Sequence, residues 1–265
     1  MSWQRILGRV SFINCDPIFH AMGNDWKVLS APPSWLTGHL LRRDCITAPI
    51  PASDYAKNCN ELLLLRDIGI VAQESVGSVI LFGHRSIESM RDIALPSDSS
   101  TSNMLIKWIL QQKGLDPKLV PMGPDIEMML DDCDGALIIG DRALSAALRN
   151  PGLVQMDLGR EWSSITGLPM VFGVFAARND TSSSSIYEAS ESMLRGYNKF
   201  LDDDFTKATV ISIASKKIGL PEDRIGKYFD SEVSNILDKS SMEGLTVFLD
   251  EVCGMNQDPI WFETA

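Results

Sequence analysis

The chain is organised around one stretch near its N-terminus, Arg9-Val10-Ser11-Phe12-Ile13-Asn14-Cys15-Asp16-Pro17. Val10 and Phe12 alternate with polar neighbours, which predicts a strand, and the proline ends it because proline cannot donate to a sheet ladder. The strand therefore stops at short polar side chains, and open α/β sheets bind their ligands at the carboxyl ends of strands. Asn, Asp and Pro are also ordinary turn residues, so a plain turn stays open as the alternative.

The composition is that of a globular protein. The chain has 265 residues, of which 45% are hydrophobic, so disorder is not expected. No window approaches the roughly 18 consecutive apolar residues that a membrane-spanning helix needs, and the N-terminus lacks the pattern of a secretory signal. We therefore expect a cytoplasmic protein. The five cysteines include no Cys-x-x-Cys pair, which favours free thiols over a disulfide framework or a zinc site.

The charge limits the partners. A formal net charge of −11 argues against nucleic acid and anionic membrane surfaces, because these partners bind clusters of Lys and Arg. It allows a small anionic ligand held by backbone N–H groups at a helix N-terminus. The three histidines lie far apart without a second ligand at metal spacing, so no metal is predicted. Nothing calls for an organic cofactor, and the oligomeric state is left open.

The order of the elements predicts an α/β fold with two lobes. Strand and helix patterns alternate from the first strand onward, which favours an α/β architecture over a sandwich. The chain leaves one unit near residue 82, builds a second, and returns along an apolar strand at residues 170–177 before helices fill the part after residue 185. Two such crossovers are typical of two-lobed folds with a ligand cleft between the lobes. We therefore assign residues 1–82 and 177–265 to lobe 1 and residues 83–176 to lobe 2.

Small polar residues at the ends of the predicted strands and at helix starts are the candidate site. They are Asn14, Ser78, Ser100, Thr101, Ser102, Asp141 and Thr166. Such hydroxyls, amides and helix N-termini orient a small anion well but supply few strong acids or bases. There is no Gly-x-Gly-x-x-Gly, Walker loop, His-Glu-x-x-His or Gly-x-Ser-x-Gly motif, so dinucleotide, nucleotide, zinc-peptidase and serine-hydrolase functions lack support. Catalysis at such a site depends on positioning and hydrogen bonding.

Each candidate also has a purely structural interpretation. The run Ser99-Ser100-Thr101-Ser102 is equally typical of a well-capped helix, and Asp141 of a residue that caps the helix after it. Arg9 can reach a ligand carboxylate, although a surface ion pair is favoured. A catalytic thiol at Cys15 would need a base, and only His20 is near it in the sequence.

Several motifs together resemble the chorismate dehydratase family of the futalosine route to menaquinone. The opening stretch resembles that family's Arg-Ile-Ser-Tyr-Leu-Asn-Thr-x-Pro, and the likeness continues in the same order over about two thirds of the chain. The further motifs are Ser78-Val79-Ile80-Leu81, Ala94-Leu95 with Ser100-Thr101-Ser102, Ala136-Leu137-Ile138-Ile139-Gly140-Asp141-Arg142-Ala143-Leu144, Asp157-Leu158-Gly159-x-Glu161-Trp162 and Thr166-Gly167-Leu168-Pro169-x-Val171-Phe172.

The resemblance implies a fold, a reaction and residue roles. The fold is the two-lobed type of periplasmic solute-binding proteins (type II), with the active site in the cleft. The reaction is the loss of water from chorismate to give 3-[(1-carboxyvinyl)oxy]benzoate, without a cofactor. Asn14 would hydrogen-bond the reacting region, and Ser78 would contact the substrate near the departing hydroxyl or a carboxylate. Ser100, Thr101 and Ser102 would bind one carboxylate. Since no protein base stands at these positions, the enolpyruvyl carboxylate of the substrate is a candidate proton acceptor.

Departures from the family pattern keep alternatives open. Cys15 replaces the usual threonine, and Phe12-Ile13 replaces Tyr-Leu. One alternative is a non-catalytic small-anion binding protein of a transport system, because fold does not fix function. Another is a chorismate-binding regulator without turnover. The related naphthoate-forming enzyme of the same pathway is disfavoured, since its Ser-Pro-Cys-Pro-Asn-Asp opening is not present.

Overall fold

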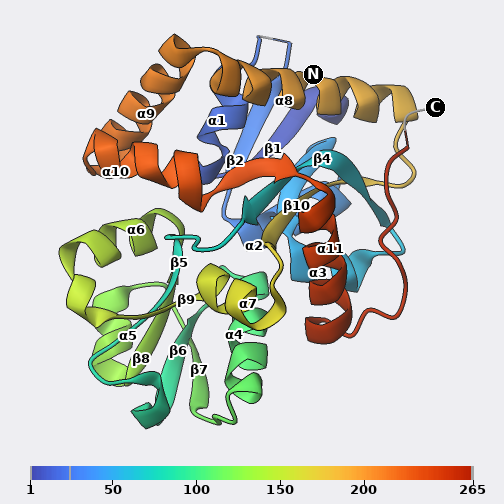
Figure 1. The fold of residues 1–265 in the computed structure, drawn as a ribbon. Helices are drawn as coiled ribbons and strands as arrows, with labels where there is room; N and C mark the ends of the chain where they lie inside the picture. The colour runs from blue at the N-terminus through green and yellow to red at the C-terminus, as the bar shows by residue number, and fades with distance from the viewer. Residues whose placement is uncertain (1, 24, 264–265) are drawn as a thin grey trace.

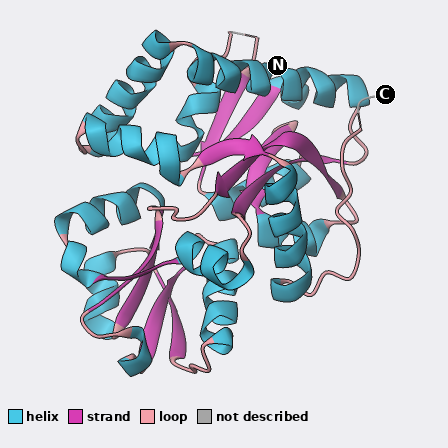
Figure 2. Cartoon of the chain, in the orientation of Figure 1, coloured by secondary structure: helices cyan, strands magenta, loops and turns pink. Residues whose placement is uncertain are grey.

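The computed structural model describes residues 2–23 and 25–263. Two β-sheets, each covered by helices, form two lobes that lie one above the other in Figure 1. Figure 2 shows the strands at the centre of each lobe and the helices around them. The α/β class predicted from the alternating pattern is thus present. None of the helices in the described ranges combines the length and the apolar character needed to cross a membrane.

The larger sheet has the strand order β11-β4-β10-β3-β1-β2. Strands β1, β2 and β3 are parallel, whereas β10 runs antiparallel to both β3 and β4, and β11 antiparallel to β4. The bounds are β1 Ile6–Val10, β2 Lys27–Ala31, β3 Thr47–Pro51, β4 Leu62–Ala72, β10 Met170–Arg178 and β11 Ser234–Leu237.

The smaller sheet has the order β7-β6-β8-β5-β9. Strands β5 and β8 are buried along their whole length, which agrees with their continuous apolar sequence. Parallel pairs join β6 to β7 and β8, and antiparallel pairs join β5 to β8 and β9. The bounds are β5 Val79–Gly83, β6 Asp92–Pro96, β7 Lys118–Met122, β8 Gly135–Ile139 and β9 Val154–Asp157.

Helices cover both sheets. Around the larger sheet lie α1 Asp16–Phe19, α2 Pro33–Leu41, α3 Ala52–Asn58, α8 Ser183–Asp202, α9 Asp204–Ile218, α10 Glu222–Lys227 and α11 Lys239–Val247. Around the smaller sheet lie α4 Ser100–Gln112, α5 Ile126–Asp132, α6 Gly140–Arg149 and α7 Leu158–Thr166. Short 3-10 helices are η1 Trp3–Arg5, η2 Ile13–Cys15, η3 Ile87–Ser89 and η4 Pro151–Leu153, and π-helical turns are η5 Tyr228–Glu232 and η6 Phe248–Val252.

Sheet membership shifts the boundaries expected from the sequence. The expected break after residue 82 falls inside β5, which pairs entirely within the smaller sheet. The expected return before residue 177 falls inside β10, which pairs entirely within the larger sheet. Hydrogen bonding continues along a whole strand, so a lobe boundary belongs in the connections. We propose that the lobes exchange chain at residues 73–78 and 167–169.

Local differences from the predicted elements have simple causes. The part after residue 185 is not entirely helical, because β11 pairs with the edge strand β4 there. The two apolar runs at 62–65 and 68–72 form one strand with Asp67 at a φ of 65° between them. Strand β1 ends at Val10, before Phe12, and Gly140 and Asp141 open helix α6 instead of ending β8. The first of these differences depends on pairing with β4, a partner that the local pattern does not contain.

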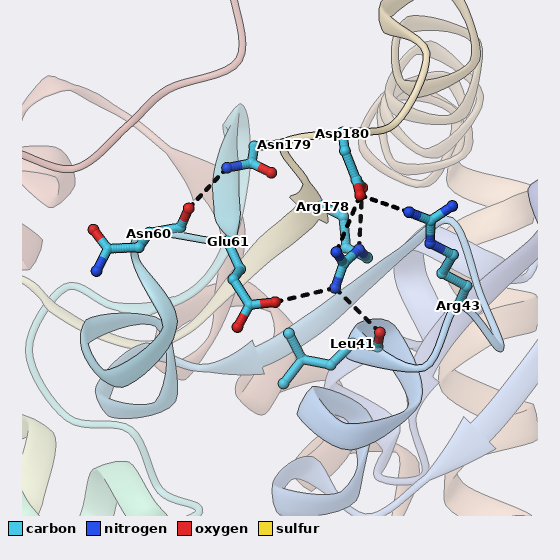
Figure 3. Close-up of polar contacts among 7 residues, drawn as sticks. All are labelled: Leu41, Arg43, Asn60, Glu61, Arg178, Asn179 and Asp180. Carbon is cyan, nitrogen blue, oxygen red and sulfur yellow. Dashed lines mark hydrogen bonds and ion pairs between the residues drawn. The ribbon is translucent and has the colours of Figure 1, made fainter.

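A polar network fastens the outer end of β10 (Figure 3). The Arg178 guanidinium donates to the backbone oxygen of Leu41 at 3.2 Å and to the Glu61 carboxylate at 3.3 Å, and it pairs with Asp180. Asn179 donates to the backbone oxygen of Asn60 at 2.8 Å. This network ties the loops after α2 and α3 to the return strand. Its role is to anchor the end of β10 that faces away from the other lobe.

Candidate active site

A cavity lies between the two sheets, at the ends of their strands. The space between its walls, including the part that is open to solvent, is about 550 Å³. Its walls are mostly apolar, with a few hydroxyls and one amide among them. The lining residues are Val10, Phe12, Asn14, Pro33, Pro49, Ile50, Pro51, Ile70, Val76, Ser78, Val79, Ser99, Thr101, Ser102, Ile139, Gly140, Phe172 and Gly173.

Strand direction explains why residues so far apart in the sequence meet here. The parallel strands β1 and β3 end at this edge of the larger sheet. Strand β10 is antiparallel to β3, with Gly173 opposite Pro51, so the beginning of β10 reaches the same edge. In the smaller sheet Val79 lies opposite Ile139, which brings the start of β5 to the end of β8. The cavity therefore occupies the place at which open α/β sheets bind ligands.

Asn14 presents an amide whose oxygen has no protein partner. The residue lies in the short helix η2, directly after β1, and it lines the cavity. Its Oδ1 atom is buried and accepts no hydrogen bond from the described residues. A buried acceptor without a donor is costly, so the cavity side of Asn14 is suited to a ligand that donates a hydrogen bond.

Ser78 is held in place from several directions. Its side chain is buried, and its Oγ lies 3.0 Å from the hydroxyl of Tyr228. Its backbone oxygen accepts from the Gly140 N–H at 2.7 Å. The preceding Gly77 has a φ of 64° and donates to the Asp157 carboxylate at 2.8 Å. The crossover that carries Ser78 is therefore rigidly fixed beside the cavity.

The N-terminus of α4 opens onto the cavity through Ser99, Thr101 and Ser102. Ser99 is the N-cap residue, but no side chain caps the helix there. The Thr101 hydroxyl is already engaged, because it accepts from the Ser53 N–H at 3.2 Å and lies 3.4 Å from the Ser53 hydroxyl. Uncapped N–H groups of a first helical turn bind anions, so backbone amides are better placed than the Thr101 hydroxyl to hold a carboxylate.

Three of the sequence-predicted site residues lie differently from expectation. Ser100 is not among the lining residues, and its buried hydroxyl has no partner among the described residues. The Asp141 carboxylate accepts from the backbone N–H of Ile13 at 3.0 Å instead of facing the cavity. The Thr166 hydroxyl donates to the Trp162 backbone oxygen at 2.9 Å and accepts from the Leu168 N–H at 3.1 Å, which closes the end of α7. The structure thus brings Asn14, Ser78, Thr101 and Ser102 together and leaves these three outside the cavity.

A family model described as menaquinone biosynthesis matches residues 6–252. The chain belongs to this menaquinone biosynthesis family. Its curated relatives include the chorismate dehydratase of Thermus thermophilus, 31% identical over 66% of this chain and 70% of that protein. They also include the chorismate dehydratase of Campylobacter jejuni, 29% identical over 64% of this chain and 66% of that protein.

Similar solved structures confirm the two-lobed fold of this member of the menaquinone biosynthesis family. Protein AF1704 from Archaeoglobus fulgidus has a TM-score of 0.73 at 20% identity, covering 94% of this chain and 97% of that one. The alkanesulfonate-binding protein SsuA from Xanthomonas axonopodis pv. citri, bound to MOPS, has a TM-score of 0.65 at 14% identity, covering 97% and 95%. The periplasmic aliphatic sulphonate binding protein SsuA of Escherichia coli has a TM-score of 0.62 at 15% identity, covering 98% of this chain and 94% of that one. The predicted periplasmic-binding-protein-like fold is therefore confirmed.

Two other residues considered in the family motif have structural roles. Cys15 is fully buried, and burial raises the pKa of its thiol to about 11, which keeps it protonated near neutral pH. It does not line the cavity. Arg9 forms an ion pair with Asp16, and its guanidinium lies over the Phe19 ring. Because Asp16 is buried, this is not the surface pair that the sequence favoured. Neither residue reaches the cavity.

Sequence reasoning missed Tyr228 and the aromatic walls of the cavity. Tyr228 lies in the π-helical turn η5, 150 residues after Ser78, so no local spacing could connect the two. Phe12 and Phe172 read as strand residues, although both line the cavity. The opening motif could have pointed to Phe12 as a site residue, because the family pattern has a tyrosine at that position. For Tyr228 the sequence carries no comparable signal.

The cavity is uncharged. Among the described residues that line it, none is Asp, Glu, Lys, Arg or His. The described ranges also contain no group of three or more His, Cys, Asp and Glu side chains placed to hold a metal ion. The lining can therefore orient a ligand and donate or accept hydrogen bonds, but it does not itself offer a strong base.

Proposed function

We propose that the protein is a chorismate dehydratase, a hydro-lyase that converts chorismate to 3-[(1-carboxyvinyl)oxy]benzoate and water in menaquinone biosynthesis. The observation that carries this proposal is the uncharged cavity, which combines one unpartnered amide, a fixed serine and an uncapped helix N-terminus. Its membership of the menaquinone biosynthesis family and its likeness to two chorismate dehydratases support the same activity.

The reaction requires little acid–base catalysis by the protein. The C3–H bond of the ring breaks, its electron pair forms the C3–C4 double bond, and the C4–O bond breaks, so the proton and the hydroxide leave as water. Because the ring becomes aromatic, the substrate itself supplies the driving force. What remains for the protein is to hold two carboxylates and to align the breaking bonds.

The site offers one built place for a carboxylate. The first turn of α4 has no side-chain cap, and Ser99 and Ser102 beside it line the cavity, so its N–H groups suit the ring carboxylate. Asn14 and Ser78 form other polar parts of the lining and are suited to contact the C4 hydroxyl of chorismate. Asn14 Oδ1 accepts from that hydroxyl in this arrangement, and Ser78 contacts the departing oxygen.

The proton acceptor in this proposal is the enolpyruvyl carboxylate of chorismate. It is attached through the ether oxygen at C3, next to the proton that leaves. In a cavity without a lining cation, a desolvated carboxylate has a raised pKa and is a stronger base than in water. An uncharged cavity is therefore an advantage for a reaction in which the substrate carries its own base.

The direct test is to incubate the purified protein with chorismate and to follow the products by liquid chromatography and mass spectrometry. We expect a product lighter by one water, with aromatic absorbance, and its formation should be about a hundredfold slower in Ser78→Ala but unchanged in Ser86→Ala. Ser86 is an exposed serine outside the cavity, so it controls for the loss of a hydroxyl. Chorismate that stays unchanged but raises the melting temperature would instead indicate a binding protein or regulator. The predicted cytoplasmic location belongs to the same proposal, and cell fractionation tests it.

A further inference from the structure

The hydroxyl of Tyr228 is buried against Ser78. The Tyr228 side chain is 1% exposed, and Ser78 Oγ at 3.0 Å is the hydrogen-bond partner that the described residues offer to its hydroxyl. Burial raises the pKa of the phenol well above its ordinary value of 10.0, so the hydroxyl keeps its proton at any working pH. The pair is thus a neutral phenol beside a neutral serine.

The direction of this hydrogen bond follows from burial. A buried O–H group that donates to nothing loses its hydrogen bond to water without compensation. Among the described residues the hydrogen-bond partner of the Tyr228 hydroxyl is Ser78 Oγ, and the distance allows either atom to donate. We take the phenol as the donor, because its proton would otherwise have no acceptor. Ser78 then receives a hydrogen bond at its oxygen, and its own proton is free to turn towards the cavity that it lines.

The turn that carries Tyr228 also holds the backbone before Ser78. Residues Tyr228–Glu232 form the π-helical turn η5, closed by a hydrogen bond from the Val233 N–H to the Tyr228 backbone oxygen at 2.9 Å. Glu232 forms an ion pair with Arg224 at 2.8 Å. It also packs closely against Gly77, because a Cβ added at Gly77 would lie 2.0 Å from the Oε2 atom of Glu232. π-helical turns often occur at functional sites. Here one turn fixes both Gly77 and Ser78.

We infer that Tyr228 is a positioning residue, which donates to Ser78 Oγ so that the Ser78 hydroxyl donates its hydrogen bond to a ligand oxygen in the cavity. This inference rests on the proposed function, in which that ligand oxygen is the C4 oxygen as it leaves chorismate. A serine polarised by a donor behind it is a better hydrogen-bond donor in front, because hydrogen bonds in a chain strengthen one another. The phenol does not touch the substrate and acts only through Ser78.

The test is a double-mutant cycle on chorismate turnover with Tyr228→Phe, Ser78→Ala and both changes together. Tyr228→Phe should lower kcat about tenfold with KM changed less than about twofold, as expected for one lost hydrogen bond that matters in the transition state. In the Ser78→Ala background the same change should leave kcat unaltered. It should also raise the melting temperature there, because it removes a phenol that has lost its acceptor.

Tyr197→Phe is the matched control. Tyr197 is also buried in the larger lobe, but its hydroxyl accepts from the Asn235 N–H at 3.1 Å and does not line the cavity. This variant should lose stability and keep the wild-type kcat. If Tyr228→Phe lowers kcat equally with and without Ser78, or resembles Tyr197→Phe, the positioning role is overturned while the dehydratase function stands.

If the wild-type protein does not turn chorismate over, calorimetry measures the binding of chorismate itself, which keeps its C4 hydroxyl, in the same four proteins. A wild-type protein without turnover whose chorismate affinity falls in Tyr228→Phe, but only when Ser78 is present, would support the positioning role and overturn the dehydratase function. A wild-type protein that neither reacts with chorismate nor binds it would overturn both.

Discussion

The backbone N–H of Ile13 donates to the carboxylate of Asp141 at 3.0 Å, and this bond joins the two lobes beside the cavity. Ile13 belongs to the turn η2 that carries Asn14, whereas Asp141 lies in the first turn of α6. A second link, from the Ser53 N–H to the Thr101 hydroxyl at 3.2 Å, joins α3 to α4. The lobes are thus fastened to each other at two points next to the place that we propose for the substrate.

Removing the Asp141 acceptor should loosen one of these links. In Asp141→Ala the N–H of the fully buried Ile13 loses its partner, so the free energy of unfolding should fall by about 1–3 kcal/mol. Asp141→Asn keeps an acceptor oxygen and should lose much less. Urea unfolding measures both variants, and KM for chorismate should rise more in Asp141→Ala. Equal losses in the two variants would show that the charge, and not the acceptor, matters here.

The same carboxyl should give a measurable pH dependence. Burial raises the pKa of Asp141 above its ordinary value of 3.8, and the Ile13 N–H, Lys217, Arg142 and Arg9 only partly offset this. The folded protein therefore holds this proton more tightly than the unfolded chain. As pH rises from 3.8 through the raised pKa, the free energy of unfolding of the wild type should fall relative to Asp141→Asn and then level off. A free energy of unfolding that rises in the wild type relative to Asp141→Asn over this range would contradict the raised pKa.

Asn14 should contribute to turnover and cost stability. Its buried Oδ1 has no partner in the described structure, so Asn14→Leu, a change of similar size, should leave the melting temperature of the free protein unchanged or raise it. The same change should lower kcat/KM by about a hundredfold if the oxygen orients the reacting hydroxyl. Asn58→Leu is the opposite control, because Asn58 donates to the Asp54 backbone oxygen at 2.7 Å outside the cavity. It should lower stability and leave kcat/KM unaltered.

The fold could be predicted because its signals are local. The buried strands β5 and β8 are continuous apolar runs, and the proline-rich entry to α2 marks a helix start. The two lobes followed from the order of these elements. Strand β11 could not be predicted in this way, because its four residues become a strand only by pairing with β4.

The site was harder to predict because specific motifs have structural roles. In the motif that runs from Asp157 to Pro169, Asp157 binds the N–H groups of Val76 and Gly77, and Trp162 donates to the Pro169 backbone oxygen. Gly159 packs against the Glu74 backbone oxygen, where an added Cβ would lie at 2.7 Å. The motif therefore builds the connection between the lobes. Residue spacing alone does not distinguish such a structural connection from a binding site.

Gly140 should be intolerant of a side chain for two separable reasons. It has a φ of 65°, and an added Cβ would lie 2.6 Å from the Phe12 ring that lines the cavity. Gly114 has a φ of 67° with nothing within 4 Å, so Gly114→Ala measures the backbone strain alone, which we expect to be about 1 kcal/mol. Gly140→Ala should cost clearly more and should also lower kcat/KM, because Phe12 must move. Similar urea midpoints and wild-type turnover in both variants would exclude the contact as a constraint.

The Cys15 thiol should be dispensable for turnover. It is fully buried, and burial raises its pKa to about 11, so at neutral pH it is neither ionised nor reachable. Iodoacetamide at neutral pH should leave chorismate turnover intact, and Cys15→Thr, which introduces the residue of the family pattern, should keep kcat within about twofold. Mass spectrometry of the treated protein shows which thiols react, and Cys15 is expected to stay unmodified. Inactivation that follows modification of Cys15 and is prevented by chorismate would instead place the thiol in the reaction.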